Sequence, residues 1–132
     1  MPDKAEFKLT KISIVMLGVR DLARAVKFYH DTLGLKVQFQ SSEFAFLDAG
    51  EVTLALAIPL AQALGGSAAK LGGAAELVFA VDDVRSAYEA LSAKGIKFIR
   101  EPHNVTGAQW AANFEDPDGH ALSVFGVNPN AA

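Results

Sequence analysis

The chain lacks cysteine, carries little net charge and contains no long apolar run. Without cysteine, neither a disulfide framework nor a thiolate metal site can form. Twelve Lys and Arg against 15 Asp and Glu give a net charge of −3, which argues against the basic footprint of a nucleic-acid binder. The most apolar stretch, residues 52–64, is too short to span a bilayer. The first residues, MPDKAEFKLTK, show no apolar signal core, so we expect a cytoplasmic protein without membrane or nucleic-acid partners.

What the chain does contain is an internal repeat. Residues 19–37 (VRDLARAVKFYHDTLGLKV) return as residues 81–99 (VDDVRSAYEALSAKGIKFI), and such self-similarity indicates a duplicated unit. Each copy follows a short apolar strand and precedes extended segments that end in a hairpin. The pattern predicts one α+β domain over residues 1–132, with two βαβββ modules (10–58 and 76–127) that form a concave mixed sheet around a cavity. An Ala- and Gly-rich linker, 59–75, is expected to be flexible.

Local signals predict where the elements begin and end. Asp21 and either Asp82 or Asp83 are expected to cap the two helices, and Gly34 and Gly95 to end them. The first hairpin is predicted to pair residues 44–47 with 52–58. The second is predicted to pair residues 109–115 with 121–126 around the turn string DPDG at 116–119.

Three strings in this sequence resemble a known family. They are VRDLARAVKFYHDTLGL, VFAVDDVRSAYEALSAKGI and FEDPDGHALSVF, and together they are similar to the vicinal oxygen chelate superfamily. That superfamily includes glyoxalase I, bleomycin-resistance proteins, fosfomycin-resistance enzymes and extradiol dioxygenases. The resemblance implies the doubled βαβββ fold and a homodimer.

The resemblance also implies where a divalent metal would be held, by one residue in the first strand and one in the last strand of each module. The four places fall on Ile14, Ala55, Glu76 and Ser123. Only Glu76 is a good ligand, so we expect no metal and no other cofactor, and dioxygenase activity is not expected. Of the histidines, His30 and His120 are expected to point outward, and His103 to be able to reach the cavity mouth.

Strand alternation predicts which side chains line the cavity. Pairing across the DPDG hairpin is expected to place Trp110 and Phe114 on the face of Ser123, and pairing across the first hairpin to place Phe46 beside Ala55. The expected ligand-binding residues are Ile14, Phe44, Phe46, Ala55, Glu76, Trp110, Phe114 and Ser123. An apolar, aromatic lining is typical of small-molecule pockets, although the same rings can instead close the sheet as core.

Glu76 admits two interpretations. It is either an exposed strand-end residue, with Arg100 as a possible ion-pair partner, or a buried carboxylate with a raised pKa that binds a ligand or acts as a general base. The leading hypothesis for the chain is a metal-free small-molecule-binding protein of the bleomycin-resistance type, which holds an aromatic or cationic organic ligand. The alternative is a glyoxalase-like lyase or isomerase that uses Glu76 as acid or base, or as part of an atypical metal site. A third possibility is a scaffold whose partner supplies the chemistry, because the fold hosts many functions.

Overall fold

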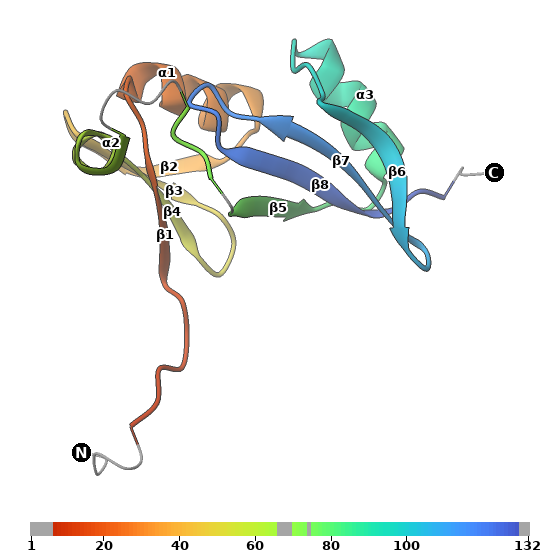
Figure 1. Ribbon diagram of the computed structural model, residues 1–132, viewed down its shortest axis with the longest axis horizontal. Helices are drawn as coiled ribbons and strands as arrows, with labels where there is room; N and C mark the ends of the chain where they lie inside the picture. The colour runs from red at the N-terminus through yellow and green to blue at the C-terminus, as the bar shows by residue number, and fades with distance from the viewer. Residues whose placement is uncertain (1–6, 66–69, 74, 130–132) are drawn as a thin grey trace.

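The computed structural model describes residues 7–65, 70–73 and 75–129, and it contains two similar halves (Figure 1). The first half holds β1 (Ile14–Gly18), α1 (Leu22–Val26), the π-helix η2 (Lys27–Thr32), β2 (Lys36–Gln40), β3 (Phe44–Asp48) and β4 (Thr53–Ala57). The helix α2 (Ile58–Gly65) follows, and the second half holds β5 (Glu76–Ala80), α3 (Val84–Ala93), β6 (Arg100–Thr106), β7 (Gln109–Glu115) and β8 (Ala121–Val127).

Each half forms a four-stranded mixed sheet with the same topology. The strand orders are β1-β4-β3-β2 and β5-β8-β7-β6, in which the first pair is parallel and the other two pairs are antiparallel. The predicted α+β fold of two βαβββ modules is therefore confirmed. We call the two halves module one and module two. No described helix is long and apolar enough to cross a membrane.

The helices begin and end where the sequence predicts. The Asp21 carboxylate accepts a hydrogen bond from the backbone N–H of Arg24 (3.0 Å), and Asp83, rather than Asp82, does the same for Ser86 (3.1 Å). Gly34 and Gly95 follow the helices with φ near 90° and 98°, a region that glycine adopts without steric penalty.

The start of the predicted linker is not a flexible connector: the prediction is wrong for residues 59–65, which lie in α2, and residues 66–69 and 74 of that linker lie outside the described residues. Pro59 lies in the first turn, where a missing N–H removes no intrahelical bond, and the alanines and leucines that follow favour helix. The helix packs on β1 at Gly18, where a Cβ would lie 2.8 Å from the backbone nitrogen of Ala61. Gly18 therefore lets α2 approach the strand.

The core lies between the helices and one face of both sheets, with α1 and α3 on the same side in Figure 1. Its buried residues are Val19, Leu22, Ala25, Tyr29, Ala45, Leu47, Leu54, Leu56, Val84, Ala112, Phe114, Leu122 and Val124. They form one cluster that spans both modules. The opposite face of each sheet, turned away from α1 and α3, is called the open face below.

Candidate functional site

The open face of module one is apolar and aromatic. Met16 on β1 and Phe46 on β3 both lie in register with Ala55 on β4, so the three side chains share one face. Phe44 and Ile14 occupy the same face two residues along their strands. The expectation that Ile14, Phe44, Phe46 and Ala55 lie together is confirmed as a matter of geometry. Their binding of a ligand stays a prediction.

Part of this aromatic surface was missed from the sequence. Phe39 on β2 pairs with Phe46, and their ring centroids are 5.6 Å apart. A bulge between Val37 and Phe39 shifts the register of β2, and no local signal in the sequence announces it. Phe39 is 52% exposed and Ile14 is 46% exposed, so this surface is open in the single chain.

The open face of module two is more polar. Ser123 on β8 lies in register with Asn113 on β7 and with Val78 on β5, and Phe125 lies two residues farther along β8. Glu76 begins β5 on the same face. Ser123 is only 2% exposed, and no hydrogen bond of the described residues joins it to Glu76.

Trp110 and Phe114 do not lie on this open face, so the predicted hairpin register is wrong. Phe114 pairs with Leu122 and Trp110 with Gly126, which turns both rings toward the helices. Phe114 is 1% exposed, and its ring contacts those of Phe28 (6.5 Å between centroids) and Phe98 (5.1 Å). Both residues serve the core rather than the cavity wall.

The turn between β7 and β8 explains the error. The last pair of the hairpin is Glu115 with Ala121, so five residues, 116–120, form the connection. The Asp116 carboxylate holds it by accepting the backbone N–H groups of Asp118 (2.9 Å) and His120 (2.8 Å). A one-residue change in loop length moves every side chain of a strand to the other face.

A pocket of about 330 Å³ lies between the modules. It is lined by β1, α2, the beginnings of β5 and β8, and by Lys70, Leu71, Gly73 and Ala75 between them. Its polar side chains are Lys70, Glu76 and His120. Glu76 is exposed at this pocket, so its interpretation as a buried carboxylate is wrong and the exposed strand-end interpretation holds. Lys70 forms an ion pair with Glu115.

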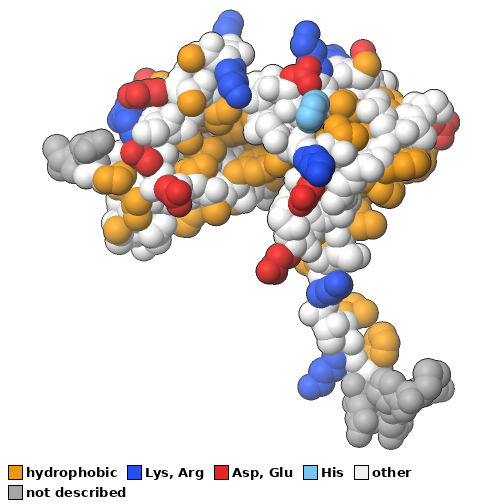
Figure 2. Space-filling model, turned by 180° about the vertical axis from the view of Figure 1, so that it is seen from behind, with side chains coloured by type: hydrophobic (Ala, Val, Ile, Leu, Met, Phe, Trp, Pro, Cys, Tyr) orange, Lys and Arg blue, Asp and Glu red, His pale blue; other side chains and the backbone are white. Residues whose placement is uncertain are grey.

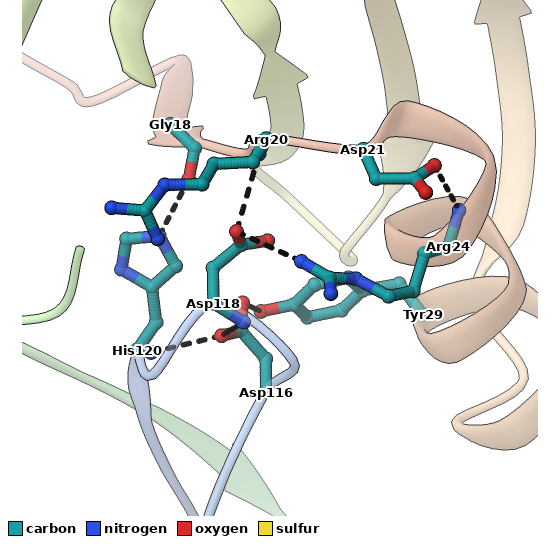
Figure 3. Close-up of polar contacts among 8 residues, drawn as sticks. All are labelled: Gly18, Arg20, Asp21, Arg24, Tyr29, Asp116, Asp118 and His120. Atoms are coloured by element: carbon teal, nitrogen blue, oxygen red, sulfur yellow. Dashed lines mark hydrogen bonds and ion pairs between the residues drawn. The ribbon is translucent and has the colours of Figure 1, made fainter. Parts of the chain in front are cut away.

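His120 does not point outward, contrary to expectation. Its Nε2 lies 2.7 Å from the backbone carbonyl oxygen of Gly18 and donates a hydrogen bond to it, which joins β1 to the DPDG turn (Figure 3). His30 is exposed as expected, with Nδ1 2.7 Å from the Leu35 carbonyl oxygen. His103 pairs with Ala111, which lies on the open face, but the His103 Nδ1 lies 2.9 Å from the Glu101 carbonyl oxygen.

A buried polar cluster fastens the modules to each other (Figure 3). The Tyr29 hydroxyl, on η2 of module one, donates to the Asp116 carboxylate of module two at 2.7 Å. Burial raises the pKa of the Tyr29 phenol above its ordinary value, and the nearby Asp116 and Asp118 carboxylates raise it further. Asp118 accepts from the Arg24 guanidinium (3.3 Å) and from the backbone N–H of Arg20 (3.2 Å). The cluster thus positions the two open faces.

The side chains at the implied metal positions do not fit a divalent ion. Ile14 and Ala55 have no donor atom, Ser123 offers only a hydroxyl, and Glu76 is the single carboxylate. Within residues 7–65, 70–73 and 75–129, no three His, Cys, Asp or Glu side chains gather closely enough to hold a metal ion.

Comparison with known proteins agrees with this architecture. The sequence profile of the glyoxalase/bleomycin resistance protein/dioxygenase superfamily matches residues 11–124. The chain belongs to that superfamily. It shares its doubled βαβββ fold with a solved structure of this superfamily.

Three relatives illustrate the range of similarity within the superfamily. An uncharacterised protein of Bacillus subtilis, YraH, is 32% identical over 87% of this chain and 97% of its own length. A lactoylglutathione lyase of Haemophilus influenzae is 34% identical over 83% of this chain and 87% of its own. The crystal structure of a superfamily protein from Nocardioides superposes with a TM-score of 0.76 at 23% identity and covers 95% of this chain and 88% of its own.

Proposed function

We propose that this chain is a metal-free small-molecule-binding protein of the bleomycin-resistance type, which holds an organic ligand with an aromatic ring and a positively charged or donor group. Two observations together support the proposal: the open face of module one is aromatic, and the four positions where the family resemblance implies metal ligands are occupied by Ile, Ala, Glu and Ser. Aromatic side chains with few polar groups are the usual lining of small-molecule sites. The exposed Glu76 carboxylate at the pocket favours a cation.

We also propose that a second copy of the chain covers the open faces. Large apolar side chains are exposed on them: Ile14, Met16, Phe39, Val78 and Val127. Figure 2 shows hydrophobic side chains over the body and along the projecting N-terminal segment, where Phe7 and Leu9 are 67% and 88% exposed. Contiguous apolar surface of this kind commonly marks an interface, and C2 dimers are the commonest solution. Light scattering after gel filtration is expected to give a dimer mass.

Isothermal titration calorimetry with a panel of cationic aromatic compounds tests the binding proposal. At least one compound is expected to bind in the micromolar range, about −8 kcal/mol, with no dependence on added EDTA. Calorimetry is preferred to Trp110 fluorescence because the indole packs on the helix side, away from the open face. The absence of heat across cationic, neutral and anionic aromatics would contradict the proposal.

The second candidate is a lactoylglutathione lyase-like activity, which the Haemophilus influenzae relative favours. It predicts that the purified protein forms lactoylglutathione from methylglyoxal and glutathione, with or without added Ni²⁺ or Zn²⁺, and that Glu76→Gln loses this activity. Turnover that survives EDTA and disappears in Glu76→Gln would support acid–base chemistry at that carboxylate. Turnover in neither condition would leave binding as the function.

A further inference from the structure

Asn113 carries a buried polar atom that no protein group satisfies. Its Oδ1 is shielded from solvent and has no hydrogen-bond partner among the described residues. A buried acceptor without a partner costs about 1–3 kcal/mol, so such atoms are rare unless something else binds them. The Asp118 and Asn128 side chains carry the other two such atoms. Asp118 belongs to the cluster at Tyr29, and Asn128 lies beyond the end of β8.

The position of Asn113 is the centre of the open face of module two. It lies in register with Ser123 on one side and Arg100 on the other, in a row that begins at Val78. Its opposite-face neighbour Phe114 is in the core, which fixes the Asn113 side chain on the open face.

The side chains around Asn113 are small or apolar. Ala111 and Ser123 are small, and Phe125 pairs with Ala111 across the β7–β8 ladder, diagonal to Asn113. A flat ring that contacts Phe125 can therefore bring its substituent to the Asn113 amide, whose carbonyl oxygen must turn from its shielded position to accept from it. The Ser123 hydroxyl, on the neighbouring strand, can serve the same substituent.

We propose that Asn113, with Ser123 beside it, forms the polar subsite of the ligand-binding face and accepts a hydrogen bond from an amine or hydroxyl group attached to an aromatic ring. This inference rests on the proposed binding function and adds the class of polar group that the ligand must carry. An acceptor-only group such as a carboxylate is disfavoured, because it would face the Asn113 oxygen.

Four naphthalenes that differ in one substituent test the inference by calorimetry. They are 1-naphthylmethylamine, 1-naphthalenemethanol, 1-methylnaphthalene and 1-naphthoate. We expect the amine and the alcohol to bind about 10-fold or more tightly than the methyl compound, and naphthoate to bind most weakly. Equal affinities would contradict the proposal that the ligand donates a hydrogen bond to Asn113. A preference for naphthoate would also contradict it, because it would mean that the Asn113 NH₂ group faces the ligand.

Two variants assign the preference to Asn113. Asn113→Leu keeps the size of the side chain and is expected to abolish the advantage of the amine and the alcohol while the methyl compound still binds. Gln109→Leu is the matched control, because Gln109 lies on the same strand and face but opposite Val127. It is expected to keep the advantage. An unchanged preference in Asn113→Leu would exclude Asn113 as the acceptor.

A measurement on the unmodified protein removes dependence on the folding of the variants. The side-chain amide signals of Asn113 in a ¹H–¹⁵N spectrum are expected to shift with the amine and the alcohol but not with the methyl compound. If all four compounds fail to bind, the proposed function fails. If they bind while the Asn113 signals stay unmoved, only the subsite is wrong.

Discussion

The two modules share one chain path and differ in the chemistry of their open faces. On the helix side, both sheets present apolar side chains: Leu54 and Leu56 in β4 correspond to Leu122 and Val124 in β8. On the open side, module one shows Phe46 and its aromatic neighbours, whereas module two shows polar groups at its centre.

This difference separates the demands of folding from those of binding. The helix-facing side chains must fill a close-packed core, so both copies of the repeat retain leucine-like residues there. The open faces are not needed to close the core, because α1 and α3 pack on the other side. They are therefore the part of the repeat that is free to specialise, and in the proposed function module one would provide ring contacts and module two hydrogen bonds.

The largest expected effect distinguishes a core ring from an open-face ring. Phe114→Ala removes a ring that is 1% exposed and is expected to lower the free energy of unfolding by about 3–5 kcal/mol. Phe46→Ala is expected to lower it by less, since Phe46 is only partly buried. Urea unfolding of the two variants measures the difference. Equal losses would contradict the assignment of Phe114 to the core.

The second effect concerns affinity and sharpens the comparison between the open faces. Phe46→Ser removes ring contact area and is expected to weaken binding of 1-naphthylmethylamine by about 10- to 100-fold, which corresponds to the 1.5–3 kcal/mol of a buried ring. Trp110→Phe, on the helix side of β7, is the control and is expected to leave affinity unchanged. Calorimetry on both variants measures the two affinities. Weaker binding by Trp110→Phe would show that the ligand contacts the helix side of β7 and not the open face.

The third effect tests whether the modules unfold together. Tyr29→Phe leaves one oxygen of the buried Asp116 carboxylate without its donor and is expected to lower the unfolding free energy by about 1–3 kcal/mol. It is also expected to broaden or split the thermal transition, because the hydroxyl joins the two modules. Differential scanning calorimetry detects this. A sharp transition at the wild-type temperature would show that the cluster contributes little to the coupling.

The same tyrosine predicts a pH dependence. An unfolded tyrosine loses its proton near pH 10.0, whereas burial first, and the Asp116 and Asp118 carboxylates next, raise the pKa of Tyr29 in the folded state. Above pH 10 the folded state therefore holds a proton that the unfolded state has lost. Stability is expected to fall with rising pH by up to about 1.4 kcal/mol per pH unit from this residue. Tyr29→Phe is expected to reduce that slope relative to wild type.

The smallest effect concerns the exposed carboxylate at the pocket. Glu76→Gln is expected to weaken binding of 1-naphthylmethylamine by no more than about 5-fold, because solvent screens an exposed charge, and to leave 1-naphthalenemethanol unaffected. Raising the salt concentration should shrink the difference further. A loss of 100-fold would indicate that a second copy buries this carboxylate in the assembly.

Much of the fold could be predicted because its signals are local. Asp21, Asp83 and Gly95 act within one helical turn, and the strands of both hairpins lie within about one residue of the predicted limits. The helix α2 was missed because an Ala-rich segment with Pro59 is compatible with both a linker and a helix. Its packing against Gly18, a contact distant in sequence, decides between them.

The candidate site was predicted less well, because strand faces depend on register. In the first hairpin the predicted pairing of Phe46 with Ala55 is confirmed. In the second, the Asp116 turn is one residue longer than the predicted DPDG turn, so the side chains of β7 lie on the opposite faces from those predicted. One signal was available: placing Trp110 and Phe114 on the same face as Leu122 and Val124 collects the bulkiest apolar side chains on one side of the hairpin. That register would have revealed Asn113 on the open face.

The bond between Tyr29 and Asp116 has an evolutionary consequence. One partner of this hydrogen bond comes from each module. A hybrid protein that joins residues 10–58 to the second module of another superfamily protein therefore keeps the bond only if that module has an aspartate in the same turn. Exchange of halves between such proteins is therefore expected to depend on this pair, while the open faces of the two sheets can differ freely.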